Sequence, residues 1–168
     1  MHLIEQDRNF NTSMGGLLPE QTGEALQHFH HVLDIACDPG EWAIATAQAY
    51  PHMQVVGIDS DAQMIDRARA QAKARGVDNV SFIMMYPFQT LDMPDGSFEL
   101  VNARFINGLI LAEAWPRVLQ EFWRVTRPGG RIRLTENELP ITSNPALAKL
   151  GGMISEALYM TRRSFSPE

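Results

Sequence analysis

The chain contains a single cysteine and carries no excess of positive charge. One cysteine cannot form an internal disulfide, and this composition favours a reducing compartment. The formal net charge of −6 argues against a broad basic surface for nucleic acid or for an anionic membrane. We therefore expect a small-molecule partner, with neither nucleic acid nor membrane among the partners.

Long apolar runs and a secretory leader are also missing. No stretch of 18 apolar residues occurs, which is about the length that a membrane-spanning helix requires. Residues 1–8 show no signal-peptide pattern. With 168 residues, 45% of them hydrophobic and 20% charged, the chain has the composition of one globular domain with a sizeable core. We expect a cytoplasmic protein.

Several chemistry-bearing patterns are absent. No Ser-His-Asp, Cys-His or zinc-ligand spacing occurs, and the dinucleotide-binding pattern Gly-x-Gly-x-x-Gly cannot be placed on the sequence. The missing glycines argue against a nicotinamide-dependent oxidoreductase. His28, His30 and His31 cluster, but alternate strand residues point to opposite faces, so a surface role is favoured over a metal site.

The most informative segment is residues 32–40, Val-Leu-Asp-Ile-Ala-Cys-Asp-Pro-Gly. It predicts a buried strand that breaks into a Pro-Gly turn at the start of a helix. Nineteen residues past Gly40, the apolar run 55–58 ends in Asp59. In such an arrangement the turn lets a nucleoside approach the backbone, helix amides point at it, and the carboxylate binds a ribose diol.

Strands and helices are predicted to alternate, as in a parallel sheet with crossover helices. Strands are expected at 31–36, 53–58, 80–85, 98–103 and 130–136, and helices at 19–27, 40–50, 62–75 and 112–126. Asp61 should cap helix 62–75, and Gly76 should end it. Two helices have predicted buried faces, which are Ile65, Ala68 and Ala72 in the first and Trp115, Val118, Leu119 and Phe122 in the second. A last helix should follow Asn144-Pro145, with core positions Leu147, Leu150, Ile154 and Leu158 and a kink or break at Gly151-Gly152.

Residues 32–40 resemble the first motif of class I S-adenosylmethionine (SAM) dependent methyltransferases, roughly Val-Leu-Asp-hydrophobic-Gly-Cys-Gly-x-Gly. Residues 56–65 resemble the second block of that family, and residues 79–82 its third strand. Residues 91–101 resemble the Leu-Pro-Phe-Pro-Asp-Gly-Ser-Phe-Asp-Leu-Val segment that leads into the fourth strand. Residues 121–130 resemble the helix and Pro-Gly-Gly turn before the fifth. The blocks follow the family's order and spacing over residues 31–136.

The resemblance implies an α/β fold, a three-layer Rossmann-like sandwich whose mainly parallel sheet has the order 3-2-1-4-5. Residues 1–30 would form a lid or helical extension, and residues 31–168 the SAM-methyltransferase-like domain. Family members normally have seven strands, and strands six and seven are missing here, so strand five would be an open edge. Either the chain is a piece of a longer enzyme, or its last helix or a partner chain, such as a second copy in a homodimer, covers that edge.

The resemblance also implies roles for individual residues. Asp59 would accept hydrogen bonds from both ribose hydroxyls of SAM. Asp34, inside an apolar strand, would hold the turn and orient the methionine amino group, or would serve structure alone by bonding loop amides. Gly40 and the Ala36-Cys37 backbone would line the methionine end, with Cys37 as part of the turn and not a nucleophile.

Further cofactor-binding positions follow from the same family pattern. Met64 matches a position that packs on adenine, although a plain core methionine fits equally well. The remaining predicted cofactor contacts are Ser60, Pro87, Asn102 through its backbone, and Ala103. Arg104 and Asn107 follow the fourth strand and would face an acceptor, or Arg104 would be a solvated loop residue.

Three positions depart from the family pattern. Ala36 replaces the first family glycine, a mild change. Asp38 replaces the second, which adopts a positive φ, and its carboxylate would either pair with the cationic cofactor or intrude on it. We favour weakened binding. Tyr86 stands where the family has an acid that accepts the adenine amino group, and a phenol is too long for the same space.

We therefore expect a methyltransferase domain that moves a methyl group from SAM to a small molecule and leaves S-adenosylhomocysteine (SAH). Direct displacement at a sulfonium relies on alignment, so no catalytic acid or base is assigned. The alternative is a non-catalytic, dimerising or regulatory scaffold with weakened or absent SAM binding. Asp38, Tyr86 and the missing strand hairpin support that alternative.

Overall fold

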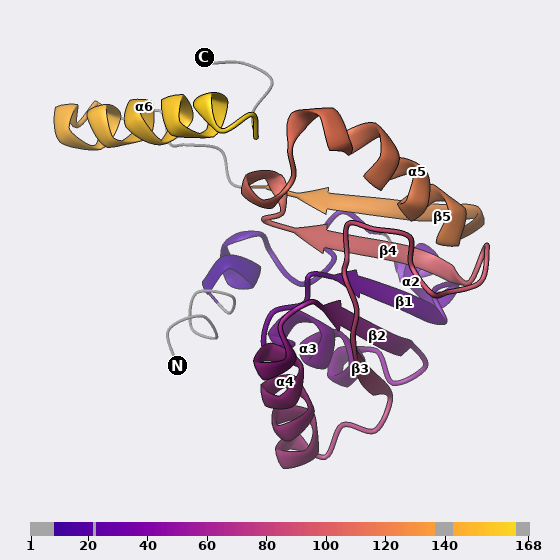
Figure 1. Ribbon diagram of the computed structural model, residues 1–168. Helices are drawn as coiled ribbons and strands as arrows, with labels where there is room; N and C mark the ends of the chain where they lie inside the picture. The colour runs from indigo at the N-terminus through magenta and orange to yellow at the C-terminus, as the bar shows by residue number, and fades with distance from the viewer. Residues whose placement is uncertain (1–8, 22, 137–142, 164–168) are drawn as a thin grey trace.

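The computed structural model describes residues 9–21, 23–136 and 143–163. Its centre is a five-stranded parallel sheet (Figure 1) in the order β3-β2-β1-β4-β5. The strands are β1 (His31–Ile35), β2 (Gln54–Asp59), β3 (Val80–Met84), β4 (Phe98–Arg104) and β5 (Thr126–Thr135). The predicted α/β fold and strand order are confirmed. The order reverses between β1 and β4, which is where open α/β sheets bind ligands.

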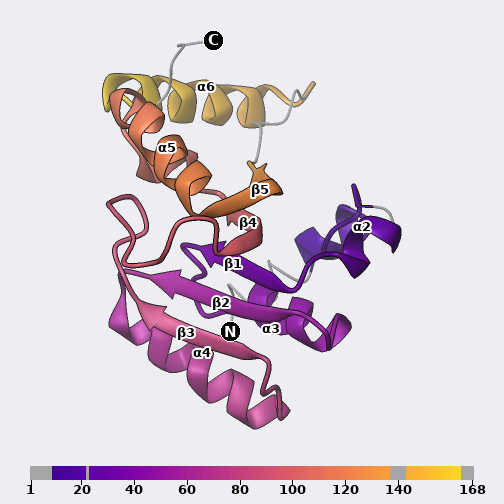
Figure 2. The same ribbon diagram turned by 90° about the vertical axis from the view of Figure 1, so that its right-hand side faces the viewer.

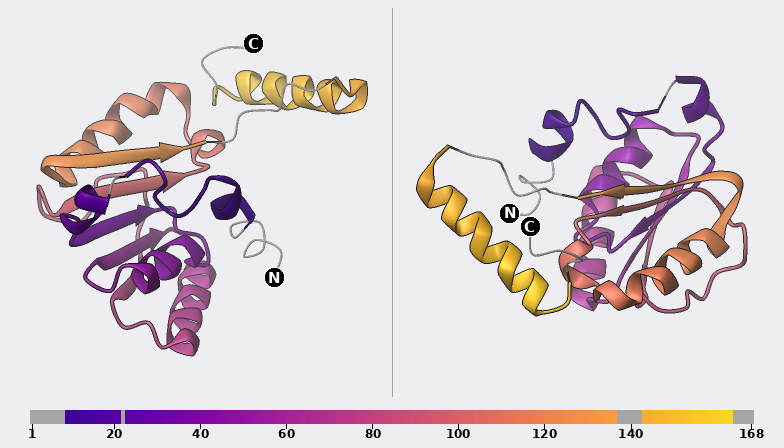
Figure 3. Two further views of the ribbon diagram at one scale, coloured as in Figure 1. Left: turned by 180° about the vertical axis from the view of Figure 1, so that it is seen from behind. Right: turned by 90° about the horizontal axis from the view of Figure 1, so that it is seen from above.

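The helices are α2 (Gly23–Gln27), α3 (Glu41–Ala49), α4 (Ala62–Arg75), α5 (Trp115–Val125) and α6 (Pro145–Met160), with the short 3-10 helices η1 (Asn107–Leu109) and η2 (Ala112–Ala114). Helices α3 and α4 cover one face of the sheet and α5 covers the other. Alternate strand residues point to opposite faces and so belong to two separate cores. Val32 packs with α3 and α4, and Leu33 packs with α5. The view from above in Figure 3 shows α3 and α5 on opposite sides of the sheet.

Helix α4 follows its sequence signals closely. The Asp61 carboxylate accepts a hydrogen bond from the Gln63 amide at 2.8 Å, which caps the first turn. Gly76 ends the helix with φ 64°, a left-handed conformation that glycine adopts without strain. Its predicted buried residues face the sheet at 1%, 0% and 6% exposure, and they are Ile65, Ala68 and Ala72.

Two predicted boundaries and one predicted buried face need correction. The helix expected at 19–27 is only α2, five residues long, because residues 19–21 form turns. On α5, Leu119 is exposed and Trp115 is half-buried, whereas Val118, Phe122 and Val125 form the buried stripe at i, i+4 and i+7. Strand β5 begins at Thr126 and not at 130, through an irregular pairing with β4 between Phe98 and Leu100.

The last helix was predicted wrongly as a core element. It runs through both glycines as one continuous helix, capped by the Asn144 carboxamide, and buries no residue. Leu147, Leu150 and Ile154 are exposed, because the described residues provide no surface against them, and Leu158 is half-buried. Figures 1 and 2 show α6 beyond the β5 edge of the sheet. Within the described chain, no helix has the length and apolarity needed to cross a bilayer.

Candidate functional site

The predicted site residues converge at the carboxyl ends of β1, β2 and β4. A cavity of about 140 Å³ lies there, at the reversal of strand order. We call it the cofactor cavity. Its lining includes Ala36, Asp38, Asp59, Ser60, Pro87 and Arg104, all predicted from the sequence, together with Phe88, Phe105 and Leu109, which were not.

The turn after β1 keeps a glycine-type backbone without the family glycines. Ala36 has φ 53° and Asp38 has φ 50°, both in the left-handed region that side chains with a Cβ rarely adopt. Gly40 has φ 79°. Each strained residue costs about 1 kcal/mol, which the surrounding fold must offset. Ala36 and Asp38 therefore adopt the positive φ that glycine would adopt without strain.

Gly40 is also required for packing. A Cβ at this position would lie 2.6 Å from the Phe82 ring and 2.8 Å from the Ala68 methyl group. Both neighbours are buried, so neither has room to retreat. The close approach brings the turn down onto β3 and α4.

The Asp59 carboxylate joins the two loops of the site. One oxygen, Oδ2, accepts a hydrogen bond from the Asp38 amide at 3.1 Å, and the other, Oδ1, accepts one from the Asp61 amide at 2.9 Å. The side chain is buried against these loops and lines the cofactor cavity. Each carboxylate oxygen has a second lone pair. Two further hydroxyl donors can therefore bind here, which is what a ribose diol supplies.

Asp34 belongs to a polar ladder that crosses three strands. The Asn102 carboxamide donates to the Asp34 carboxylate at 2.7 Å, and Arg133 donates to the Asn102 oxygen at 3.0 Å. Arg133 also donates to Glu20 at 2.8 Å. Asp34, Asn102 and Arg133 occupy paired register positions on β1, β4 and β5.

This ladder explains how a carboxylate is accommodated inside an apolar strand. Asn102 was expected to act through its backbone, but its side chain is also engaged. The sequence analysis did not single out Arg133, because only the strand register places it beside Asn102. Burial tends to raise the pKa of Glu20, but hydrogen bonds and the charge of Arg133 outweigh it and lower that pKa.

The segment over the site comes from the N-terminal residues. Arg104 lies over the Trp42 and Phe105 rings, each at 5.7 Å, and donates to the Asn11 side chain at 3.0 Å. Phe10 meets Phe105 edge to face with ring centroids 4.7 Å apart. Arg104 is therefore half-buried and bound to this segment, and the interpretation as a solvated loop residue is wrong. Residues 1–8 of the predicted lid lie outside the described residues.

Eight of the fourteen predicted site residues do not line the cofactor cavity, and they are Asp34, Cys37, Gly40, Met64, Tyr86, Asn102, Ala103 and Asn107. Tyr86 is 60% exposed, and Met64 is half-buried at the start of α4. Asn107 lies in η1, where its backbone amide donates to Glu136 at 3.1 Å. Phe88, two residues beyond Tyr86, lines the cavity wall where Tyr86 was expected. Because Phe88 is the aromatic residue directly after Pro87, the sequence could have indicated it as a lining residue.

The surroundings of Cys37 disfavour its thiolate form. Burial raises the pKa of its thiol far above the usual range, and the charges of Asp34, Asp59 and Asp38 raise it further. A thiol that stays protonated neither attacks an electrophile nor ligates a metal. Among the residues that the structure describes, no three potential ligand side chains gather into a metal site.

Comparison with known proteins places this geometry in a family. Residues 32–130 match the family model of a methyltransferase domain. Demethylmenaquinone methyltransferase of Geobacillus kaustophilus is 37% identical to the chain over 116 residues, which cover 68% of this chain and 48% of that protein. The chain thus spans about half the length of the curated relatives it matches.

Solved structures share the same fold. The PH0226 protein of Pyrococcus horikoshii OT3 superposes with a TM-score of 0.66 at 25% identity, over 77% of this chain and 59% of that one. Coclaurine N-methyltransferase, solved with N-methylheliamine and SAH, has a TM-score of 0.57 at 16% identity, over 62% of this chain and 30% of that one. Since the family model also covers more than half of the chain, this protein belongs to the Rossmann-like, SAM-dependent methyltransferase family.

Proposed function

We propose that this chain binds SAM at the cofactor cavity and transfers its methyl group to a small-molecule acceptor. The observation that carries the proposal is the Asp59 carboxylate. It is fixed by two backbone amides at the end of β2, and it lines the cavity with lone pairs to spare. This is the arrangement that a ribose diol needs, in a chain whose family uses that cofactor.

Each part of the site has a proposed task. Asp59 and Ser60 would hold the ribose, while Pro87 and Phe88 would enclose the adenine, with Met64 and Tyr86 at its margin. The backbone of Ala36, Cys37 and Ala103 would line the methionine end, where the family places its charged amino group. The remaining proposed contacts there are Asp38, the backbone of Gly40, and Asp34 and Asn102 through the ladder.

The bound cofactor would supply a methyl group on a sulfonium, which already carries a good leaving group. The protein's contribution is then alignment of the acceptor, together with exclusion of water. We assign no catalytic acid or base. Arg104 lines the cavity under the N-terminal segment and remains the proposed acceptor contact. Asn107 remains a second proposed contact.

The volume of the site sets a requirement on the N-terminal segment. About 140 Å³ is less than the roughly 300 Å³ at which small-molecule pockets begin. The segment around Phe10 and Asn11 covers Arg104 and Phe105. We propose that residues 1–30 act as a lid that must shift before the cofactor enters, with residues 31–168 as the domain that holds it.

The acceptor class follows from the relatives. Several curated relatives are demethylmenaquinone methyltransferases, so we propose a small, ring-bearing acceptor related to that class. A cytoplasmic location and a homodimer with the second copy on the β5 edge complete the proposal. The scaffold alternative gains no support from these relatives.

A titration with SAM and SAH tests the proposal. We expect micromolar binding by calorimetry, and a loss of roughly 10- to 100-fold in Asp59→Asn, because a charged hydrogen-bond acceptor is removed. Asp61→Asn is the matched control: it removes the same charge two residues away, and asparagine caps α4 as well as aspartate does. Absence of binding up to millimolar ligand from folded protein would contradict the proposal.

A further inference from the structure

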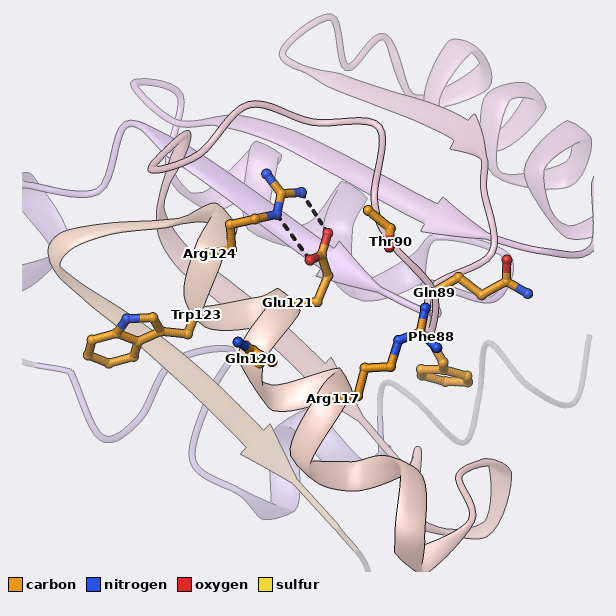
Figure 4. A pocket seen from close by; sticks show the side chains of 8 residues that line it. All are labelled: Phe88, Gln89, Thr90, Arg117, Gln120, Glu121, Trp123 and Arg124. Carbon is orange, nitrogen blue, oxygen red and sulfur yellow. Dashed lines mark hydrogen bonds and ion pairs between the residues drawn. The ribbon is translucent and has the colours of Figure 1, made fainter.

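A second cavity of about 420 Å³ lies outside the cofactor cavity, between the segment after β3 and helix α5 (Figure 4). Its volume falls within the roughly 300–1,000 Å³ of small-molecule sites. Phe88, Gln89 and Thr90 form one wall, and five residues of α5 form the other, namely Arg117, Gln120, Glu121, Trp123 and Arg124. We call it the α5 cavity.

The acidic side chain of this cavity is already neutralised. Glu121 accepts two hydrogen bonds from Arg124, at 2.6 and 3.0 Å, and one from the Leu91 amide at 2.7 Å (Figure 4). The hydrogen bond from Arg124 is the main reason why the pKa of Glu121 is lowered. Arg124 also donates to the Met93 carbonyl at 2.8 Å and to Asp95 at 2.5 Å. Both members of the pair are therefore committed to structure.

Arg117 is the third charged side chain that lines the α5 cavity. Among the residues that the structure describes, its guanidinium makes no hydrogen bond or ion pair, although its positive charge helps to lower the pKa of Glu121. The lining thus carries one uncommitted cation in a protein of net charge −6. A guanidinium that faces open space binds a carboxylate through two parallel hydrogen bonds.

The other lining groups define the rest of the ligand. The side chains of Gln89, Thr90 and Gln120 likewise have no hydrogen-bond partner within the described part of the chain, so they offer additional donors. Phe88 supplies aromatic surface beside Arg117, whereas the 75% exposed Trp123 points away from both (Figure 4). We propose that the α5 cavity binds a small aromatic carboxylate, with its carboxylate on Arg117 and its ring against Phe88.

Phe88 connects this cavity with the cofactor cavity. It lines both, and it packs against the core that contains Ile58 and Leu33. A ligand that displaces or fixes Phe88 therefore changes the wall of the cofactor cavity. The coupling is reciprocal, so SAH must alter the affinity of the aromatic carboxylate by the same factor. This coupling rests on the proposed function, whereas binding at Arg117 does not.

The binding test uses 2-naphthoate as the probe, with calorimetry and tryptophan fluorescence on the full chain. We expect submillimolar affinity that falls roughly 10- to 100-fold in Arg117→Gln, because a charged hydrogen bond is lost. Arg67→Gln is the matched control, since Arg67 is exposed on α4 and lines neither cavity. Equal losses in the two variants, or equal affinity for uncharged 2-naphthamide, would overturn the proposal.

The coupling test measures SAH affinity with and without saturating 2-naphthoate. A change of about fivefold or more, abolished in Phe88→Leu, is the expected result. An unchanged SAH affinity in the presence of bound naphthoate would overturn the coupling. If SAH does not bind at all while naphthoate still requires Arg117, the proposed function fails and the α5 cavity stands.

Discussion

The middle of the sheet and its β5 edge differ sharply in how well they are covered. In β2, Val55 and Ile58 are buried, and α4 packs three side chains onto the sheet. At the edge, β5 buries only its two terminal threonines, and α6 buries nothing among the described residues. The cofactor cavity lies at the carboxyl ends of the middle strands. The turn that forms it is therefore held by a packed core, whereas β5 offers an edge that folded proteins usually protect.

The largest expected difference is in the stability loss caused by alanine at two glycines of nearly equal φ, Gly40 and Gly129. Gly40→Ala puts a methyl group into Phe82 and Ala68 at φ 79°, whereas Gly129→Ala, at φ 81° in β5, meets no atom within 4 Å. We expect Gly40→Ala to lower the free energy of unfolding by about 3 kcal/mol and Gly129→Ala by about 1 kcal/mol. Urea unfolding measures both. Equal losses would mean that the turn is not packed as described.

The next comparison sets a buried isoleucine against an exposed one. Ile65→Ala on α4 empties a fully buried site and should cost about 3 kcal/mol of stability. Ile154→Ala on α6, where the residue is 40% exposed, should cost less than about 0.5 kcal/mol. Thermal unfolding of the two variants gives the difference. A large loss in Ile154→Ala would indicate that α6 is covered in solution.

The Glu121–Arg124 ion pair on α5 should carry pH dependence. The folded pKa of Glu121 is lowered, so its contribution to stability is present above its unfolded pKa of about 4.3 and is lost as pH falls through the folded pKa. Glu121→Gln should cost about 2 kcal/mol at pH 7, and this difference should shrink below about pH 4.

The matched substitution at a more exposed ion pair is Glu113→Gln. Glu113 pairs with Arg162 at 3.5 Å, and both side chains are mostly exposed. Its loss should change stability by less than about 0.5 kcal/mol at either pH. Denaturant melts at pH 7 and pH 3.5 test both variants. A pH-independent loss in Glu121→Gln would exclude a role for its charge.

The smallest expected change in stability comes from placing glycine at two residues with positive φ, Asp38 and Arg162. Asp38→Gly removes backbone strain in the turn and should raise stability by about 0.5 kcal/mol, while SAM affinity rises several-fold as bulk leaves the cavity. Arg162→Gly, at φ 58° after α6, should stabilise that helix end similarly and leave SAM affinity unchanged. Calorimetric titration of both variants with SAM measures the two affinities. Weaker SAM binding in Asp38→Gly would indicate that its carboxylate pairs with the cofactor.

Local signals predicted the central part of the molecule well. Asp61 and Gly76 bound α4 because a side-chain cap and a left-handed glycine act within one helical turn. Asp59 could be assigned to the cavity for a related reason, since a residue that ends a buried parallel strand must lie at the ligand-binding edge of the sheet. Family motifs supplied the strand order.

Other members of the site depend on contacts between distant segments. Arg133 reaches Asn102 only through the register of β5, and Phe88 reaches two cavities only through the path of the loop after β3. The pattern of α6 was that of a buried helix, yet nothing in its sequence shows whether a surface exists to receive it.

The sequence by itself determined the parallel α/β architecture, the ends of α4 and the carboxylate at the end of β2, because periodicity, capping and motif spacing act over short distances. Only the tertiary structure decided that Ala36 and Asp38 keep a glycine-type turn, that Asp34 is held by a ladder ending at Glu20, and that α6 remains uncovered. Those outcomes depend on which distant segments the core brings within a few ångströms of one another, and local pattern carries no such information.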